Sequence, residues 1–323
     1  MKKLLLLPVL FLIAVSIGVY WFWNNTKAVS TDKSFQDFLI TKGTSATQVA
    51  NGLSKAGLIK SPLAFKIYVQ LTGKSGNIQA GEYRLSPSYN LFQLLEQLGR
   101  GPSEIWVTIP EGLRREEVAI RFATSLEKDQ DFIDEFMEAS EGFEGHLFPD
   151  TYLFPKTVSA STVVTRMRNV FDTKVSTLEN NTSYTQAELV TLASLIERET
   201  KTSAERPIVA GILMNRLEIG MALQIDASVQ YALANSKYKA PSFSIKWWEP
   251  VLRNDLQINS PYNTYRFPGI PPGPIASPGL SSLEAAFNPE ESPYLYYIHD
   301  TNGGIHYART LEEHNKNVQD YLN

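Results

Sequence analysis

The chain has 323 residues, of which 43% are hydrophobic and 20% charged, a composition typical of globular proteins with two or three domains. Its formal net charge is −4, so it lacks the basic surface of a nucleic-acid-binding protein. It contains no cysteine, which excludes disulfides, Cys-ligated zinc, iron–sulfur clusters and cysteine nucleophiles. The four histidines are scattered along the chain, so no metal site is expected.

The N-terminus carries an uncharged apolar stretch over residues 4–23, preceded by Lys2 and Lys3. Twenty helical residues extend about 30 Å, which matches the hydrocarbon core of a bilayer. The lysines predict a cytoplasmic tip over residues 1–3 and a single transmembrane helix in the inner (cytoplasmic) membrane, with everything from Asn24 onward outside it. A cleaved signal peptide is the alternative, but no small-residue cleavage site follows Trp23.

Two similar segments follow, and each predicts the end of a strand, a Gly turn and an amphipathic helix. The first contains Ile40 and Gly43 and the second contains Ile109 and Gly112. We therefore expect a membrane-proximal α/β unit over residues 24–102 and a second strand–helix unit with a hinge over residues 103–155. The expected helices are 45–56, 62–72, 91–98 and 114–126, and the expected strands are 81–85 and 104–109.

The residues from 142 to 155 are rich in Gly, Pro and aromatic side chains, which predicts the hinge into a larger domain over residues 156–323. The whole chain is therefore expected to be α+β. The expected helices of the last domain are 162–178, 185–200, 205–218, 282–287 and 311–321, and a hairpin is expected over 294–299 and 304–308.

The helix expected over residues 185–200 is the most informative segment. Thr185 and Glu188 have the spacing of a capping box, and the residues that follow are almost all apolar, as in a buried helix. Glu197 and Glu199 border its apolar face. Burial of a carboxyl raises its pKa, which suits a general acid that works near neutral pH.

A plainer interpretation is that one of these carboxylates forms an ion pair at the end of the helix. Arg198, Lys201 and Arg206 are the available partners. The pattern alone does not choose between Glu197 and Glu199.

Several segments, in this order, resemble the endolytic murein transglycosylases, the YceG-like family. They are AGEYRL (80–85), EGHLFPDTY (144–152), LASLIERET (192–200), ERPIVAGILMNRLEIGMALQID (205–226), SPYNTY (260–265), GIPPGPIASPG (269–279) and EEHN (312–315). The resemblance implies a membrane-anchored lyase that cuts new peptidoglycan glycan strands internally, which would end their elongation. It also implies LysM-like units before an α+β catalytic domain. The implied partners are glycan strands and peptidoglycan synthases (penicillin-binding proteins).

The family's catalytic glutamate falls at the first Glu of its Ala-Ser-x-x-Glu-x-Glu pattern, which is Glu197 in this chain. The resemblance implies that Glu197 protonates the oxygen between N-acetylmuramic acid and N-acetylglucosamine. It then takes the proton of the muramic 6-hydroxyl, which attacks C1 of the same sugar. The product ends in a 1,6-anhydro ring, and the reaction needs no metal or other cofactor.

Further substrate-binding candidates lie in the other matching segments. They are Gln224, Asp226, Tyr262, Asn263, Tyr265, Glu313, His314 and Asn315. Glu313 has an alternative role, because Thr310 and Glu313 also have the spacing of a capping box. Trp247 and Trp248 are weaker candidates for stacking on sugar rings.

Two other functions stay open. One is a catalytically silent, anchored wall-binding or scaffold protein, and the other is a hydrolytic muramidase that releases a reducing end. An assay of glycan cleavage with Glu197→Gln tests the first alternative. The product mass tests the second, because an anhydro end is lighter by one water.

Overall fold

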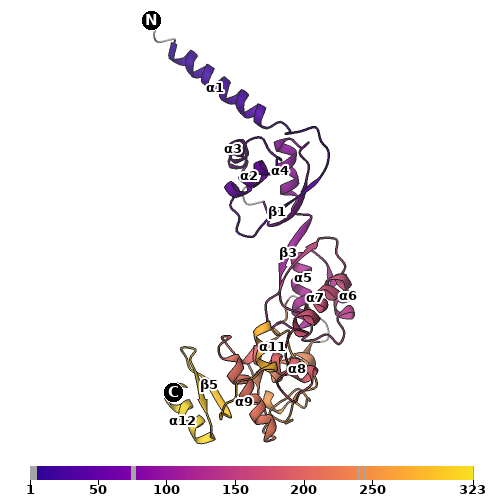
Figure 1. Ribbon diagram of the computed structural model, residues 1–323, viewed down its shortest axis with the longest axis vertical. Coiled ribbons are helices and arrows are strands. Elements are labelled where there is room, and N and C mark those ends of the chain that lie inside the picture. The colour runs from indigo at the N-terminus through magenta and orange to yellow at the C-terminus, as the bar shows by residue number, and fades with distance from the viewer. Residues whose placement is uncertain (1–5, 74–77, 239–240, 243, 323) are drawn as a thin grey trace. The chain divides into compact units, whose positions relative to one another are not determined.

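The computed structural model describes residues 6–73, 78–238, 241–242 and 244–322, and Figure 1 follows its elements along the chain. The chain folds into two compact units. The first comprises Met1–Trp106 and Leu153–Thr157, and the second comprises Val107–Tyr152 and Val158–Asn323. Residues 107–152 therefore belong to the same unit as most of the C-terminal part, whereas the sequence predicts a boundary after residue 155.

The first unit combines helices with a small antiparallel sheet. Its elements are α1 (Leu6–Asn25), β1 (Gln36–Ile40), α2 (Ala46–Lys55), α3 (Pro62–Thr72), β2 (Gly81–Leu85) and α4 (Leu91–Gly99). β1 pairs with β2 from Gln36 opposite Leu85 to Ile40 opposite Gly81. The sheet order is β1-β2-β3-β4, and β3 (Glu104–Thr108) and β4 (Thr151–Pro155) each begin in one unit and end in the other.

Local sequence signals explain the helix starts of this unit. Ser45 with Gln48 and Asn90 with Gln93 form reciprocal capping boxes at the starts of α2 and α4. The apolar faces of these helices then pack into one core with β2. Gly81 has a φ of +149°, and a side chain there would collide with the Glu104 carbonyl oxygen, so the first residue of β2 has to be glycine.

The expectation of a transmembrane helix over residues 4–23 is not supported. Within the described ranges of the chain, no helix is both long and apolar enough to span a bilayer. The expected span included the leucines at positions 4 and 5, which lie outside the described residues. The expected cytoplasmic tip over residues 1–3 also lies outside them. α1 instead extends to the polar residues Asn24 and Asn25.

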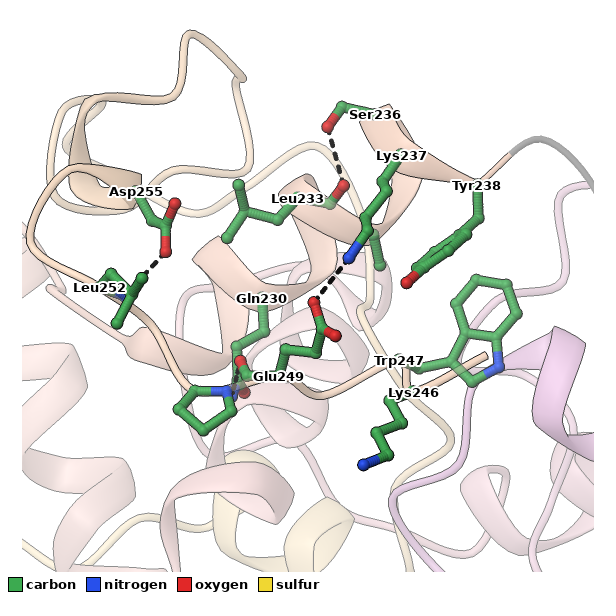
Figure 2. Close-up of a pocket in the computed structure, with 12 residues that line it drawn as sticks. Gln230, Leu233, Ser236, Lys237, Tyr238, Lys246, Trp247, Glu249, Leu252 and Asp255 are labelled. Carbon is green, nitrogen blue, oxygen red and sulfur yellow. Dashed lines mark hydrogen bonds and ion pairs between the residues drawn. The ribbon is translucent and has the colours of Figure 1, made fainter. Parts of the chain in front are cut away.

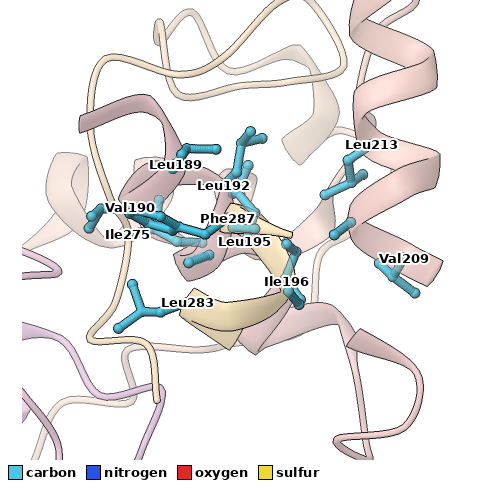
Figure 3. Packing of buried hydrophobic residues seen from close by; sticks show 14 of the residues in the cluster. Leu189, Val190, Leu192, Leu195, Ile196, Val209, Leu213, Ile275, Leu283 and Phe287 are labelled. Carbon is cyan, nitrogen blue, oxygen red and sulfur yellow. The ribbon is translucent and has the colours of Figure 1, made fainter. Parts of the chain in front are cut away.

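The second unit is built around α8 (Gln186–Glu199), whose residues from Leu189 to Ile196 are all buried. α8 packs against α9 (Arg206–Glu218) and α11 (Leu280–Phe287), and Figure 3 shows their side chains in one cluster. The other helices are α5 (Arg115–Ser125), α6 (Gln130–Ala139), α7 (Ala160–Val175), α10 (Asp226–Lys237), the short 3-10 helix η2 (Asp255–Gln257) and α12 (Leu311–Leu322). β5 (Tyr296–His299) and β6 (Ile305–Ala308) form a hairpin against which α12 packs.

The repeated strand–turn–helix segments are confirmed. β1 ends at Ile40, Gly43 has a φ of +86°, and α2 begins at Ala46. After β3, Gly112 has a φ of +76° and α5 begins at Arg115. Both turns therefore use a left-handed glycine three residues before the helix. Whether these units are LysM-like stays a prediction.

Three features differ from the expectations. Helices α6 and α10 were not predicted, although the helices that flank them were. The segment 142–155, expected to be a hinge, contains β4 and buries Leu147, Phe148 and Tyr152. Its aromatic and aliphatic side chains are core residues, and Gly145, with a φ of +75°, lets the chain pass close to Pro274.

Candidate active site

The carboxyl of Glu197 lies at the C-terminal end of α8, where its side chain is only 7% exposed. Three groups donate hydrogen bonds to it. The Arg206 guanidinium is 3.0 Å from Oε1, and the Ser282 hydroxyl and the Gly279 backbone N–H are 2.7 and 3.0 Å from Oε2. Gly279 is the N-cap of α11, so two of these donors come from the start of that helix. Each Glu197 oxygen is therefore a hydrogen-bond acceptor in this state.

Arg206 is shared between two carboxylates. The same guanidinium nitrogen, Nη2, lies 3.2 Å from Oε2 of Glu111. The Glu111 side chain is 46% exposed, whereas that of Arg206 is 11% exposed. The ion pair of Glu197 with Arg206 is the alternative that the sequence left open, and it is confirmed. Glu111 is a second carboxylate at this site that sequence reasoning missed.

The loop that contains Glu111 is held against the loop that leads to Gly279. Gly112 N–H donates to the Ser277 carbonyl at 2.8 Å, and Ser277 N–H donates to the Leu113 carbonyl at 2.8 Å. Ser194 in the middle of α8 accepts from Ile275 N–H at 3.1 Å. The Pro/Gly-rich loop is thus fixed by backbone hydrogen bonds to the Glu111 loop and by the Ser194 hydroxyl of α8, and this positions the Gly279 N–H against Glu197.

Glu199 occupies different surroundings from Glu197. Its Oε2 accepts a hydrogen bond from the Tyr297 hydroxyl at 2.8 Å, on β5. Burial raises the pKa of the Glu199 carboxyl, the negative charge of Asp226 adds to the effect, and the hydrogen bond from Tyr297 opposes it. The expected raised pKa of a buried carboxyl on this helix is therefore confirmed for Glu199.

Asp226 and Tyr265 lie near Glu199. The Tyr265 hydroxyl donates to Asp226 Oδ1 at 2.6 Å. Burial raises the pKa of Tyr265, and the hydrogen bond to Asp226 and the charges of Asp226 and Glu199 add to the effect. Gln224, just before α10, is exposed and has a φ of +53°. The structure thus brings Asp226 and Tyr265 toward Glu199, which the sequence did not predict.

The next two candidates have different positions. Tyr262 is half-buried and packs on Tyr231 with ring centroids 4.8 Å apart. Asn263 is fully buried, and its amide nitrogen donates to the Leu256 and Ile258 carbonyls at 2.9 Å each. Asn263 therefore stabilises its own loop. The expectation that it contacts a sugar is not supported, because its amide is buried and already donates to two backbone carbonyls.

The C-terminal candidates lie on α12. Glu313 receives a hydrogen bond from Arg309 N–H at 2.8 Å, and its own N–H donates to Thr310 Oγ1 at 3.2 Å, so the capping-box alternative is confirmed. His314 stacks on Tyr296 of β5 with ring centroids 5.2 Å apart. Asn315 is exposed on the helix surface. The hydrogen bonds of Glu313 therefore cap the start of α12, and the His314 ring packs this helix against the β5–β6 hairpin.

The two tryptophans differ from one another. Trp248 donates to Glu117 at 3.0 Å and packs under the guanidinium of Arg198, the residue after Glu197. Trp247 is buried and lines a pocket of about 440 Å³ beside α10. Figure 2 shows this pocket, with Tyr238 next to Trp247 and an ion pair of 2.8 Å between Lys237 and Glu249.

Another carboxyl that sequence reasoning missed, that of Glu144, lines a separate pocket. The signal was available, because Glu144 opens the segment EGHLFPDTY that matches the family. No group of three or more His, Asp or Glu side chains in the described part of the chain is arranged to hold a metal ion.

The family profile described as "YceG-like family" matches residues 38–320. The chain belongs to the YceG-like family. An endolytic murein transglycosylase of Bacillus subtilis (strain 168) is 34% identical to this YceG-like chain over 314 residues, which cover 88% of this chain and 84% of that protein.

Two further relatives extend the comparison of this YceG-like chain. An endolytic murein transglycosylase of Streptococcus pneumoniae serotype 2 is 29% identical over 339 residues, and the match covers 91% of this chain but only 60% of that longer protein. The crystal structure of a YceG-like protein of Listeria monocytogenes superimposes with a TM-score of 0.53 and 30% identity, covering 88% of this chain and 99% of that one.

Proposed function

We propose that this chain is an endolytic murein transglycosylase that cuts peptidoglycan glycan strands internally, with Glu197 as its acid and base. Family membership and the names of the relatives support the activity. The choice of Glu197 rests on its buried carboxyl. This carboxyl accepts hydrogen bonds from a side chain on α9 and from two groups at the start of α11. A buried carboxyl oriented by three fixed donors suits proton transfer at a defined atom.

The reaction uses one carboxyl twice. Protonated Glu197 donates its proton to the oxygen that links C1 of N-acetylmuramic acid to the next sugar, and that C1–O bond breaks. The carboxylate that remains takes the proton of the muramic 6-hydroxyl, whose oxygen forms a new bond to C1. The proton on Glu197 is thereby restored, and no water is consumed. Because the nucleophile belongs to the same sugar, its orientation replaces a second catalytic carboxylate.

The neighbours of Glu197 support this cycle. Arg206 compensates the negative charge on Glu197 after it donates its proton, and Ser282 and the Gly279 N–H fix the carboxylate plane. Proton donation requires one Glu197 oxygen to exchange its present contact for the glycosidic oxygen. Arg206 already has a second partner in Glu111, so this exchange leaves its charge paired.

The mass of the reaction products is the test of this proposal. The full chain is incubated with purified peptide-free glycan strands, and the products are separated by length and weighed. Internal cutting gives a mixture of intermediate lengths, and each new end is one water lighter than a reducing end. Products with ordinary reducing ends would make the chain a hydrolytic muramidase, and the absence of products would favour a wall-binding or scaffold protein.

The proposed substrate also determines where the enzyme works. Peptidoglycan lies outside the cytoplasmic membrane, so the proposed activity is extracytoplasmic, and internal cutting of new strands would limit their length. A partnership with peptidoglycan synthases stays a prediction. Co-purification of a synthase with the Glu197→Gln protein, which would hold its substrate without cutting it, checks that prediction.

A further inference from the structure

A second pocket in the C-terminal unit surrounds Glu144 and has a volume of about 430 Å³. Its walls come from six segments of the chain: the start of α5, residues 142–146, α8, α10, the segment 260–265 and the Pro/Gly-rich loop. The side chains that matter here are Glu144, His146, Thr191, Tyr231, Tyr262 and Pro272. The lining therefore combines aromatic rings with a few polar groups, as in sites that bind small neutral molecules.

The Glu144 carboxyl is weakly bonded in this pocket. Its Oε1 accepts from the Arg115 backbone N–H at 3.2 Å, and its Oε2 accepts from the Tyr231 hydroxyl at 3.4 Å, both long for such bonds. Burial raises the pKa of this carboxyl to about 8, the negative charge of Glu116 adds to the effect, and Arg114 and Arg115 oppose it. Burial therefore favours the protonated form of this carboxyl, which has a proton to donate in a hydrogen bond.

The charges around the pocket disfavour an ionic ligand. Arg115 lines it, and the Arg114 guanidinium packs 4.3 Å from the ring centre of Tyr231, so a cationic group would be repelled. The negative charge of Glu116, which is paired with Arg114 at 3.0 Å, would oppose an anion. The remaining titratable neighbours, His146, Tyr231 and Tyr262, are neutral at pH 7, because burial lowers the pKa of His146 and raises the pKa of both tyrosines.

Two segments of the chain connect the pocket to Glu197. Thr191, in its wall, precedes Glu197 by six residues of α8, which is about 9 Å along the helix axis. The loop that supplies Pro272 continues to Gly279, which donates to Glu197. One or two linked sugar rings cover such a distance, so a strand cut at Glu197 can place a neighbouring sugar beside Glu144.

We infer that this pocket is a subsite for an N-acetylated sugar next to the cleaved bond, in which Glu144 donates a hydrogen bond to the acetamido carbonyl oxygen and Tyr262 contacts the ring. The inference rests on the proposed function, since it takes the glycan strand as the ligand. It adds a substrate-binding residue that differs chemically from Glu197, because Glu144 acts in its neutral form and exchanges no proton with the substrate.

Binding to a protein that does not cut tests this subsite. In the Glu197→Gln full chain, the dissociation constant for an N-acetylglucosamine tetrasaccharide is measured by calorimetry at pH 6 and pH 9. We expect binding to weaken roughly tenfold at pH 9, the effect of one lost hydrogen bond, because ionised Glu144 no longer donates. Adding Glu144→Gln should remove this pH dependence, because the carboxamide keeps its N–H at both pH values.

Two further variants complete the design. Glu144→Ala should weaken binding about tenfold at pH 6, and Glu138→Gln, which changes an exposed carboxylate on α6, should change nothing. An unchanged pH dependence in Glu144→Gln, or unchanged binding in folded Glu144→Ala, would overturn the subsite. If the Glu144 variants bind the tetrasaccharide as tightly as the parent protein but bind strands with peptide stems more weakly, the pocket binds the stem, and the inference is also wrong.

Cleavage of glycan strands by the wild-type chain is measured in parallel. Absence of cleavage means that the proposed function fails. Cleavage by the wild-type chain together with binding that is insensitive to Glu144 means that only the subsite fails.

Discussion

Glu197 and Glu199 are two residues apart at the end of α8, yet their surroundings are opposite in kind. Glu197 meets a guanidinium, a hydroxyl and a backbone N–H, all of which donate to it. Glu199 is buried, which raises the pKa of its carboxyl, and it accepts a hydrogen bond from the Tyr297 hydroxyl and lies near the negative charge of Asp226. Residues two apart on a helix point about 200° apart, so one carboxyl faces α9 and α11 and the other faces β5.

This difference shows that proximity on a buried helix does not define a chemical environment. Both side chains border the same apolar face, and from the sequence both were expected to be desolvated carboxyls. The groups that contact each carboxyl come from other elements of the fold. These groups decide whether the charge of the carboxylate is compensated by a bonded cation, as at Glu197, or the carboxyl accepts a hydrogen bond from a tyrosine hydroxyl, as at Glu199. The two glutamates therefore allow matched substitutions, one at each position, that separate catalysis from burial.

The largest effect is expected for Glu197→Gln, which should reduce glycan cleavage by roughly 10²- to 10⁴-fold. The carboxamide has nearly the same shape and still accepts hydrogen bonds at its one oxygen, but it can neither transfer a proton to the glycosidic oxygen nor take one back. The rate of strand cleavage is measured together with the thermal unfolding midpoint. Glu199→Gln is the matched control, and it should retain most of the activity. A reversal of these two results would move the catalytic role to Glu199.

The next largest effect is expected on stability for Arg206→Met. This substitution leaves Glu197 without its cation in a place where both side chains are nearly buried, so we expect a loss of about 3 kcal/mol in the free energy of unfolding. Combining it with Glu197→Gln should restore part of that loss, since no uncompensated charge remains. Urea denaturation of the two single variants and the double variant measures the coupling, and additive losses would contradict it.

A smaller, pH-dependent effect is expected at Glu199. Because its pKa is raised in the folded state, the folded protein binds a proton more tightly than the unfolded chain does. This contribution to stability is complete below the unfolded pKa of about 4.5 and is lost as the pH rises through the folded pKa. Glu199→Gln has no such loss.

The stability of Glu199→Gln relative to the wild type should therefore increase as the pH rises above about 4.5, by about 1.4 kcal/mol for each unit by which the folded pKa exceeds the unfolded one. Urea denaturation of both proteins between pH 4 and pH 8 measures this difference. A difference that stays constant with pH would show that burial does not perturb Glu199.

The smallest effect is expected for Glu111→Gln. Glu111 is half-exposed, so its ion pair with Arg206 should contribute less than about 1 kcal/mol to stability. If Glu111 does share Arg206 during proton transfer, the cleavage rate should fall by a few-fold while the unfolding midpoint stays nearly constant. A loss as large as that of Glu197→Gln would instead make Glu111 a second essential carboxylate.

Much of the secondary structure could be predicted because its signals are local. The capping box of Thr185 and Glu188 and the apolar run after it define α8 within one residue at each end. The two glycine turns at Gly43 and Gly112 are likewise set by neighbouring residues. Helix α10 was missed because its start has no side-chain cap hydrogen bond and follows Gln224, whose positive φ the sequence does not announce.

The sequence by itself therefore determined the family, the order of most elements and the choice of α8 as the helix with the informative glutamates. Only the tertiary structure decided which partners each glutamate meets. Arg206 is nine residues from Glu197, but Ser282 is 85 residues away, and Glu111 is 95 residues from Arg206. Periodicity and capping describe neighbours along one helix, whereas these contacts depend on how α8, α9 and α11 pack together. The nearby Arg206 could be proposed from the sequence, but no local pattern could have predicted the contacts with Ser282 and Glu111, because they require segments distant in the sequence to meet in space.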